Sequence, residues 1–298
     1  MRVLLAGATG TIGRAVAAEL ARRGHAVMPF GREGVAALPG AGLPAGLEAV
    51  VSCLASRSGA PQDAWAVDHA AHAAVLQAAV AAGVPRWVQL SAICVQKPQL
   101  AFQQAKLAFE AELAAAPLDW TVVRPTAFFK SLSGQVARVA AGRPFLVFGD
   151  GRLTACKPVS DADLARFLAD VLADPATHGR VLPIGGPGPA ITPLDQVAML
   201  ERLLGRAVPV RRVPLALMGA IIGGLSVAGL VWPRAREKAE LARIGRYYAT
   251  ESMLVWDPAA GRYDAEATPE TGTGRLEDHY AALLSGKVAD DRGAHAVF

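Results

Sequence analysis

The sequence predicts an α/β fold in which helices cover both faces of a parallel β-sheet and a small mixed lobe follows toward the C-terminus. Three observations predict it. An apolar run over residues 3–6 passes directly into a glycine-rich turn and then into an alanine-rich helix over residues 11–23. Apolar, strand-like runs then alternate with helical patterns to about residue 125. The 298 residues are enough to bury a full α/β core and an appended lobe.

The glycine-rich turn contains three glycines spaced three residues apart, in the run Gly7-Ala-Thr-Gly10-Thr-Ile-Gly13. Gly7 permits a tight turn out of the strand, Gly10 lets the backbone approach a pyrophosphate, and Gly13 lets the helix pack close to the sheet. The free N–H groups of the helix N-terminus attract phosphate. The pattern is typical of a Rossmann-like doubly wound sheet, with cofactor contacts expected from Gly7, Thr9, Gly10, Thr11, Ile12 and Gly13. The alternative is that the glycines only pack a tight turn.

The second strand, residues 26–30, predicts which dinucleotide binds. No acidic residue follows it to hold an adenosine 2′-hydroxyl, whereas Arg32 stands where it can pair with a 2′-phosphate. NADPH is therefore expected as the cofactor. The alternative for Arg32 is a solvated surface arginine.

The segment between the second strand and the next apolar run is unusually short. It comprises residues 31–48 and contains Pro39, Pro44 and five glycines. A third strand with its crossover helices needs ~30 residues or more. We therefore expect the third strand to be missing and the segment to be a loop or a short helix. The second strand would then be an exposed edge, with weaker NADPH binding at the adenine end.

The carboxyl ends of the next strands predict the catalytic edge of the sheet. The strand over residues 49–54 delivers Leu54, Ala55 and Ser56 to the cofactor, and a long helix over residues 63–82 follows it. The strand over residues 87–91 delivers Ser91, and eleven residues later Phe102 and Lys106 lie on one face of a helix that runs to residue 115. Short-chain dehydrogenases carry Ser and then Tyr-x-x-x-Lys at this spacing, but phenylalanine replaces the tyrosine here. We expect Lys106 to reach the nicotinamide ribose; the alternative is a solvated helix charge.

A strand over residues 120–124 is followed by a loop expected to cover the nicotinamide, with Pro125 and Phe128 against the cofactor and Phe128 and Phe129 against the substrate. We expect a dinucleotide-binding core over residues 1–125, to which some later strands contribute, and a substrate lobe over residues 126–298. The lobe should contain helices over residues 161–173, 193–204, 236–247 and 275–285, a strand over residues 181–184, and a hairpin over residues 252–264. Thr192 should cap the helix over residues 193–204.

Residues 213–232 carry no charge and are bracketed by arginines. A hydropathy window favours a transmembrane helix, but one proline and four glycines within the run indicate a broken helical lid instead. We expect short helices over an apolar pocket, or contact with a bilayer surface.

Composition excludes several classes of function. The net charge of +4 is mild and aromatic residues are few, so no nucleic-acid surface is expected. The three cysteines are far apart, which argues against a zinc site, any other metal site or a disulfide framework. We expect a cytoplasmic protein, with peripheral contact to a membrane as an option.

Several longer runs resemble one family, the divinyl (proto)chlorophyllide 8-vinyl reductases, which belong to the atypical, NmrA-like short-chain dehydrogenases. They cover nearly the whole chain: Val-Ser-Cys-Leu-Ala-Ser-Arg over residues 51–57, Leu-Ser-Ala-Ile-Cys-Val-Gln-Lys-Pro over 90–98, Phe-Gln-Gln-Ala-Lys-Leu-Ala-Phe-Glu over 102–110, Arg-Pro-Thr-Ala-Phe-Phe-Lys-Ser-Leu over 124–132, Ala-Cys-Lys-Pro over 155–158, Leu-Pro-Ile-Gly-Gly-Pro-Gly over 182–188 and Ile-Gly-Arg-Tyr-Tyr-Ala-Thr-Glu-Ser-Met over 244–253. A phenylalanine at position 102 is the family's own pattern, whereas the short segment over residues 31–48 departs from it.

The resemblance implies NADPH-dependent reduction of the C8 vinyl group of a tetrapyrrole to ethyl, with Lys106, Ser91 and Phe102 as the catalytic residues. A vinyl group conjugated to the macrocycle offers no oxyanion for a tyrosine to protonate. The substrate's exact form, the oligomeric state and the proton donor, among Ser91, Lys106 and water, stay open. The alternatives are a non-catalytic NmrA-like NADP-sensing protein and an isoflavone-reductase-like enzyme that acts on small aromatic compounds.

Overall fold

The computed structural model describes residues 1–289. The chain divides into two compact units. The first, here called the Rossmann unit, comprises Met1–Ser56, Pro61–Pro125 and Asp161–Ile184. The second unit comprises Arg57–Ala60, Thr126–Ser160 and the chain from Gly185 onward. The boundary expected after residue 125 is one of the junctions between the units. The expectation that residues 161–173 and 181–184 belong to the substrate lobe is wrong, because the strand over residues 180–184 pairs with the strand that ends at Pro125 and so extends the sheet of the first unit.

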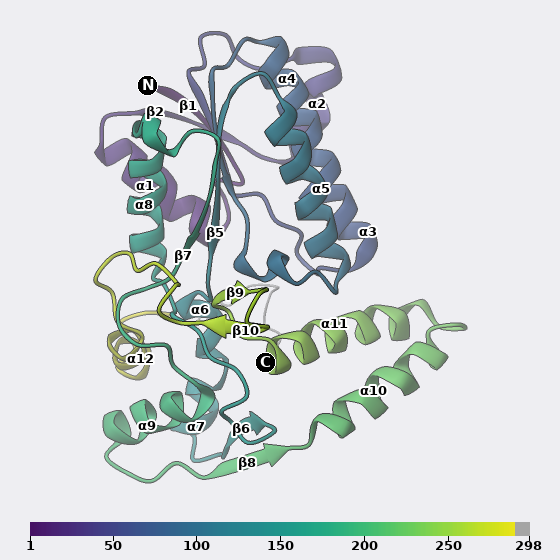
Figure 1. Cartoon of the computed structure of the whole chain (residues 1–298), viewed down its shortest axis with the longest axis vertical. Coiled ribbons are helices and arrows are strands. Elements are labelled where there is room, and N and C mark those ends of the chain that lie inside the picture. Colours follow the sequence, from purple (N-terminus) through teal and green to yellow (C-terminus); the bar gives the residue numbers. More distant parts are fainter. Residues whose placement is uncertain (290–298) are drawn as a thin grey trace. The chain divides into compact units, whose positions relative to one another are not determined.

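The Rossmann unit is built on a parallel six-stranded sheet with the strand order β2-β1-β3-β4-β5-β7 (Figure 1). This is the order expected for a doubly wound sheet whose usual third strand is missing. The fold class predicted from the sequence is confirmed. The strands are β1 (Arg2–Ala6), β2 (Ala26–Phe30), β3 (Ala49–Ser52), β4 (Arg86–Leu90), β5 (Asp119–Pro125) and β7 (Arg180–Ile184).

Helices cover both faces of the sheet, because successive residues of each buried strand point to opposite sides. On one face α1 (Thr11–Arg22) packs against α8 (Asp161–Ala173). The other face carries α2 (Arg32–Ala41), α4 (His72–Ala81) and α5 (Ala101–Ala115) (Figure 1). Its core contains the fully buried Trp87 and Phe109.

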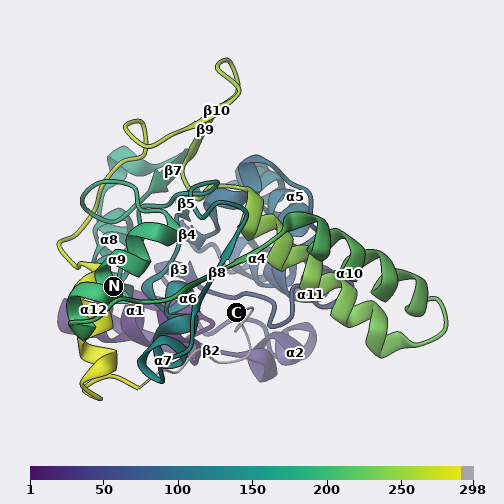
Figure 2. The same ribbon diagram turned by 90° about the horizontal axis from the view of Figure 1, so that it is seen from below.

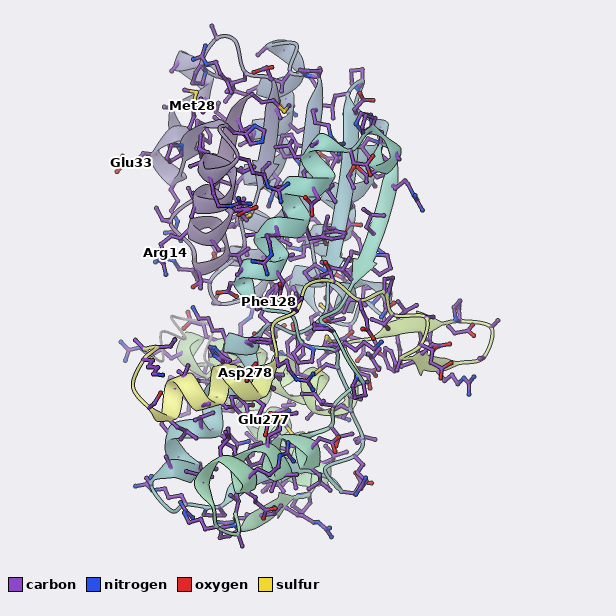
Figure 3. The ribbon with its side chains drawn as sticks, turned by 90° about the vertical axis from the view of Figure 1, so that its left-hand side faces the viewer. Arg14, Met28, Glu33, Phe128, Glu277 and Asp278 are labelled. Atoms are coloured by element: carbon purple, nitrogen blue, oxygen red, sulfur yellow. The ribbon has the colours of Figure 1, made fainter. Side chains whose placement is uncertain are left out.

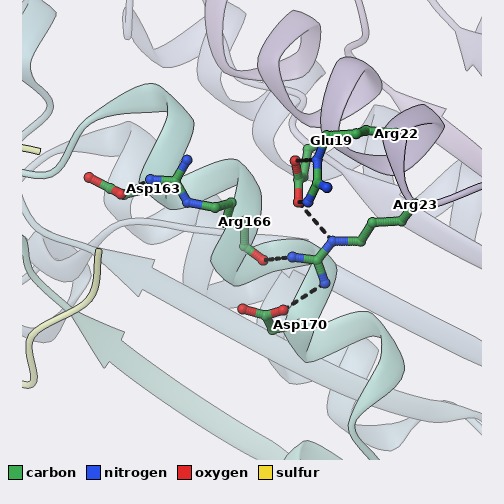
Figure 4. A network of polar contacts seen from close by, with 6 residues as sticks. All are labelled: Glu19, Arg22, Arg23, Asp163, Arg166 and Asp170. Atoms are coloured by element: carbon green, nitrogen blue, oxygen red, sulfur yellow. Dashed lines mark hydrogen bonds and ion pairs between the residues drawn. The ribbon is translucent and has the colours of Figure 1, made fainter. Parts of the chain in front are cut away.

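A polar cluster joins α1 to α8 (Figure 4). Glu19 accepts hydrogen bonds from Arg22 and Arg23, and Arg23 also donates to the carboxylate of Asp170 at 2.6 Å and to the backbone oxygen of Arg166. The two arginines lower the pKa of Glu19 to about 2. The segment 161–173 is thereby held to the Rossmann unit although more than a hundred residues separate it from α1.

The short segment after β2 contains helix α2, and no strand lies between β2 and β3 in the described chain. This confirms the prediction of a short helix in place of a third strand. The helix accommodates Pro39 close to its end, where the missing N–H costs one hydrogen bond. Phe30 and Leu47 are buried in the same core, and Val35, Leu38 and Leu43 pack against it. The crossover is therefore a compact apolar connection.

The helix predicted over residues 63–82 spans residues 61–81, but its interior differs from an α-helix. It consists of α3 (Pro61–Ala64), a π-helical segment (Trp65–Ala71) and α4. A π segment adds a residue to the turn and rotates the side chains that follow it. Asp68 and His72 are both turned into the buried side, each about 1 % exposed.

The second unit contains several helices and two small two-stranded sheets (Figure 1). The expected hairpin is present as antiparallel β9 (Val255–Asp257) and β10 (Arg262–Asp264). Thr192 caps α9 (Pro193–Leu204) through the backbone of Asp195, as its sequence predicts. The parallel pair β6 (Phe145–Phe148) and β8 (Val210–Val213) was not predicted. The remaining elements of this unit are α6 (Phe129–Leu132), α7 (Val136–Ala140), α12 (Leu276–Leu284) and a 3₁₀ turn over 133–135; the 3₁₀ turns over 93–96 and 175–177 belong to the Rossmann unit.

The prediction of a broken helix over residues 213–232 is wrong. Leu215–Ala228 form one continuous helix, α10, which is followed by α11 (Pro233–Thr250). The glycines inside α10 face open space, since a Cβ atom added at Gly219, Gly223 or Gly224 would meet nothing within 4 Å. Packing of α10 against α11 stabilises the helix despite their low helix propensity. No helix among residues 1–289 combines the length and the apolar character that a membrane crossing requires.

The buried His72 predicts how folding stability depends on pH. His72 Nδ1 donates to the backbone oxygen of Val67 at 2.9 Å, and Nε2 accepts from Gln89 Nε2 at 3.2 Å. Gln89 cannot turn its amide over, because its other contacts, from Trp87 Nε1 and to the oxygen of Leu90, fix its orientation. A proton on Nε2 would therefore face another donor. Burial and the nearby Lys106 ammonium lower the pKa of His72 to about 4.

We expect the free energy of unfolding to fall as the pH drops from 6.5 toward 4, because the unfolded chain takes up a proton on His72 in this range and the folded chain does not. The loss between pH 7.5 and 5 should be about 2 kcal/mol from this group. Urea titrations of the wild type and of His72→Gln measure it. The variant should lose much of this pH dependence; an unchanged dependence would contradict the assignment.

Candidate cofactor and active site

In the glycine turn between β1 and α1, backbone packs directly against backbone. Gly7 has φ +81°, and a Cβ atom there would lie 2.8 Å from the carbonyl of Cys53. A Cβ atom at Gly13 would lie 2.1 Å from the Gly7 oxygen. Only glycine fits either position. The predicted roles of these two glycines in the turn and in close helix packing are thus met by the geometry.

Gly10 is different, because a Cβ atom there would meet only the Gly7 oxygen, at 3.5 Å. Its φ of −71° suits any residue, so the fold does not require glycine at this position. Thr9 and Gly10 are exposed, and α1 begins at Thr11 without a side-chain cap on its N-terminus. Arg14 donates to the backbone oxygen of Thr9 at 2.9 Å and supports the turn. An exposed, uncapped helix N-terminus behind an open glycine fits a dinucleotide pyrophosphate.

The neighbouring strand β3 ends at the same edge. Cys53 N donates to the oxygen of Ala6, so the residues after β3 run alongside the glycine turn. Leu54 is half-buried and Ala55 is exposed. Ser56 is buried, and its N–H donates to Asp68 Oδ1 at 3.3 Å. The π-helical segment is therefore joined to the loop that the sequence assigns to the cofactor.

Lys106 is paired with a buried carboxylate. Its Nζ lies 2.8 Å from Asp68 Oδ1, and the side chains are 11 % and 1 % exposed, respectively. Within the described chain, the other oxygen of Asp68 is buried without a hydrogen-bond partner. Removing Lys106 would leave this carboxylate buried and uncompensated, which is costly. The alternative of a solvated helix charge for Lys106 is therefore wrong.

Ser91 belongs to a second buried polar chain. Its hydroxyl donates to Glu110 Oε1 at 2.5 Å, and Glu110 also forms an ion pair with Arg124. Ser91 and Glu110 are both less than a tenth exposed. The proton of Ser91 thus points to Glu110, and the hydroxyl oxygen keeps lone pairs that can accept a hydrogen bond.

The start of α5 places Phe102 and Lys106. Gln103 is fully buried; its side-chain oxygen accepts from the N–H groups of Gln99 and Leu100, and its amide donates to the oxygen of Cys94. These bonds fix the helix start against the loop that follows β4. Phe102 and Lys106 then lie one turn apart on the same face, and both are half-buried.

Two further residues that the sequence assigns to the cofactor, Arg32 and Pro125, also belong to the Rossmann unit. Arg32 is exposed and is the first residue of α2, directly after β2. Figure 3 shows Glu33, its neighbour, projecting outward at the left margin, with Arg14 of α1 below it on the same side of this unit. Pro125 ends β5 and is buried.

Phe128 and Phe129 belong to the second unit. There Phe128 forms an isolated β-bridge with Val159, and the N–H of Phe129 donates to the oxygen of Val159. Phe128 is half-buried (Figure 3), whereas Phe129 is 6 % exposed and its ring packs against His279 at 5.6 Å. Phe129 is therefore core of its own unit. A role of either ring against the substrate stays a prediction.

Asp68 and Glu110, the partners of Lys106 and Ser91, were not predicted from the sequence. A signal was present, because Asp68 directly follows the apolar residues 64–67 and Glu110 directly follows the apolar residues 107–109. A charged residue on a buried face needs a partner. Their pairing could not be deduced, since Asp68 lies 38 residues from Lys106 and reaches the site through the π segment.

Comparison with known proteins decides the family. Residues 41–175 match a family model described as NAD(P)H-binding. The chloroplastic divinyl chlorophyllide a 8-vinyl-reductase of Oryza sativa subsp. indica is 45 % identical over 331 residues, covering 99 % of this chain and 82 % of the relative. The protein of the same name from Arabidopsis thaliana is 43 % identical and covers 95 % of this chain and 77 % of the relative. The chain belongs to the divinyl chlorophyllide a 8-vinyl-reductase family.

A solved structure supports the fold. The NADPH-dependent quinone oxidoreductase of Escherichia coli, in complex with NADPH, aligns with a TM-score of 0.64 at 20 % identity over 95 % of this chain and 99 % of that chain. The aligned span with the rice relative, 331 residues, exceeds the 298 residues of this chain. Relatives of this family thus carry additional residues inside the matched region, and their placement in the segment after β2 stays a prediction.

The contrast between Gly10 and Gly13 predicts two distinguishable outcomes. Gly10→Ala should fold normally, with an unfolding temperature within ~2 °C of the wild type, but should bind NADPH about tenfold or more weakly because its Cβ atom enters the space of the pyrophosphate. Gly13→Ala should lose about 3 kcal/mol or more of stability, because its Cβ atom overlaps the Gly7 oxygen. Thermal unfolding and calorimetric titration with NADPH measure both. A destabilised Gly10→Ala variant with normal NADPH affinity would contradict this division of roles.

Proposed function

We propose that this chain is an NADPH-dependent oxidoreductase that reduces the C8 vinyl group of divinyl chlorophyllide or divinyl protochlorophyllide to ethyl, a step of chlorophyll or bacteriochlorophyll biosynthesis. The observation that carries the proposal is the 43–46 % identity, along 95–99 % of the chain, to four proteins named divinyl chlorophyllide a 8-vinyl-reductase. The glycine turn, which any such reductase needs, is intact.

The dinucleotide, when bound, supplies a hydride. The chain contributes the phosphate cradle of Gly7 to Gly13 and a fixed ammonium at Lys106. An ammonium has three N–H donors, of which Asp68 takes one, so Lys106 can still donate to the ribose hydroxyls of the cofactor. Asp68 acts as a positioning residue, because its ion pair holds Lys106 Nζ in one place.

Phe102 fits reduction of a carbon–carbon double bond. Its position on α5 is the one from which a phenol protonates an oxyanion in ketone reduction, and phenylalanine cannot donate a proton. A vinyl group on a conjugated macrocycle develops no oxyanion, so the reaction needs no phenol at this position one turn from Lys106. Ser91 directs its proton to Glu110, which leaves Lys106 and water as the candidates for the proton that completes the ethyl group.

The assay that tests the function follows the absorption spectrum of divinyl chlorophyllide incubated with the protein and NADPH. We expect conversion to the monovinyl pigment by the wild type and by the exposed control Lys287→Ala. Lys106→Ala should lower kcat/KM about 100-fold, because a misplaced nicotinamide ribose disturbs the reacting geometry. Asp68→Asn should raise KM for NADPH and lower kcat. Its kcat/KM should lie between that of the wild type and that of Lys106→Ala. No spectral change with tightly bound NADPH would favour a nucleotide-sensing protein, and wild-type turnover by Lys106→Ala would refute the role of that residue.

Arg32 is proposed to select NADPH over NADH. Its exposed guanidinium follows β2 at the N-terminus of α2, where a 2′-phosphate would meet both the side chain and free backbone N–H groups. Arg32→Ala should reduce the ratio of NADPH to NADH affinity about 10- to 100-fold. The matched control is Arg22→Ala, because Arg22 is an exposed arginine at the C-terminal end of α1. Unchanged binding of both cofactors by Arg32→Ala would sink the assignment. Weaker NADPH binding than in longer relatives stays a prediction of the short crossover.

A further inference from the structure

Helices α10 and α11 form a hairpin that carries the most exposed apolar side chains of the described chain. In Figure 1 and Figure 2 the two helices lie side by side and extend away from the rest of the second unit. Around the turn between them, the exposed fractions are 69 % for Val227, 85 % for Leu230, 74 % for Val231 and 65 % for Trp232. No residue of α10 is buried. An apolar tip of this size on a folded unit marks a binding surface.

Contacts at the turn and between the two helices hold the hairpin together. A Cβ atom at Gly229 would lie 3.0 Å from the backbone of Arg236, so the turn brings the two helices into close contact. Arg243 of α11 donates to Ser226 Oγ at 2.7 Å and pairs with Glu240. Ser226 in turn donates to the oxygen of Ile222. The apolar tip is therefore presented by packed helices.

The hairpin and the strand that leads into it are strongly positive. Residues 211–246 contain seven basic and two acidic side chains, a net charge of +5. Arg211 and Arg212 stand on β8 before α10, and Arg234, Arg236 and Lys238 follow the tip on the first turns of α11; all five are exposed. A hollow of about 530 Å³ at the turn combines the apolar Leu225 and Trp232 with Arg234 and Lys238. It suits an anionic headgroup attached to an apolar chain.

We propose that this hairpin docks the protein onto an anionic lipid bilayer surface. The tip residues Val227, Leu230, Val231 and Trp232 enter the boundary between headgroups and acyl chains, and the flanking arginines and lysine contact lipid phosphates. A tryptophan beside basic residues is the composition favoured at this boundary. At about 1.5 Å per residue, the 14 residues of α10 span about 21 Å, less than the ~30 Å of a hydrocarbon core, so the hairpin lies in the surface. Docking by this hairpin is a separate property from the proposed reaction and does not depend on it.

The test uses the full chain without cofactor or pigment, so that failure of the proposed reaction cannot affect it. Sedimentation with vesicles of phosphatidylcholine containing about 30 % phosphatidylglycerol measures binding. We expect binding that weakens from about 0.1 M to 0.5 M NaCl and is at least about tenfold weaker on pure phosphatidylcholine. The double variant Leu230→Gln/Val231→Gln should bind at least about tenfold more weakly. Leu153→Gln, an exposed leucine elsewhere in the same unit, should bind normally.

A second measurement keeps the test valid if the double variant does not fold. Tryptophan emission of the wild type should be quenched by brominated lipid more than that of Trp232→Phe, because Trp232 is the tryptophan at the tip. Vesicle binding unchanged in the double variant, or no binding by the wild type, would overturn the proposal. So would a dimer in sedimentation velocity that the double variant loses without any vesicle binding, since a second copy would then cover the tip.

Discussion

The contact between the Gly7 carbonyl and the first turn of α1 is the constraint on which the Rossmann unit depends. Gly7 lies against the backbone of Cys53 and Gly13 lies against Gly7, so β1, β3 and α1 meet with no side chain between them. This closeness sets where the free N–H groups of α1 point, and it brings the residues after β3 alongside the turn. Gly10, the glycine that the fold does not need, is the one that stays open. Its presence is explained by a ligand better than by packing.

Behind this edge, two buried acidic residues hold the side chains that the sequence predicts to be catalytic. Asp68 pairs with Lys106, and Glu110 joins Ser91 to Arg124. Buried carboxylates are costly unless they are paired, so each pair fixes its partner more strictly than a surface contact would. The π-helical segment turns Asp68 inward, and the neutral His72 one turn later completes the same buried layer. Lys106 and Ser91 are therefore each held by a buried partner at this edge of the sheet.

Sequence patterns with a local cause predicted this structure well. The glycine turn, the strand order without a third strand, the Thr192 cap and the hairpin over residues 252–264 all follow from short-range chemistry or from chain length. The partners of Lys106 and Ser91 depend on which helix faces meet across the sheet, and the π segment that aims Asp68 has no signal in the residues that form it. The parallel pair of β6 and β8 joins strands of four residues each that lie more than sixty residues apart, which local patterns cannot reveal.

The apolar stretch over residues 213–232 shows why composition alone misleads in both directions. Its glycines predicted a broken helix, yet α10 is continuous because α11 packs along it and Arg243 binds Ser226. Its lack of charge resembled a membrane span, yet the helix ends after 14 residues, at a turn where Gly229 approaches Arg236. Helix propensity is a matter of about 1 kcal/mol per glycine, and packing against a neighbouring helix exceeds it. The residues left uncovered by that packing are apolar and flanked by arginines, and a bilayer surface offers both the hydrocarbon and the phosphates that such a hairpin lacks in water.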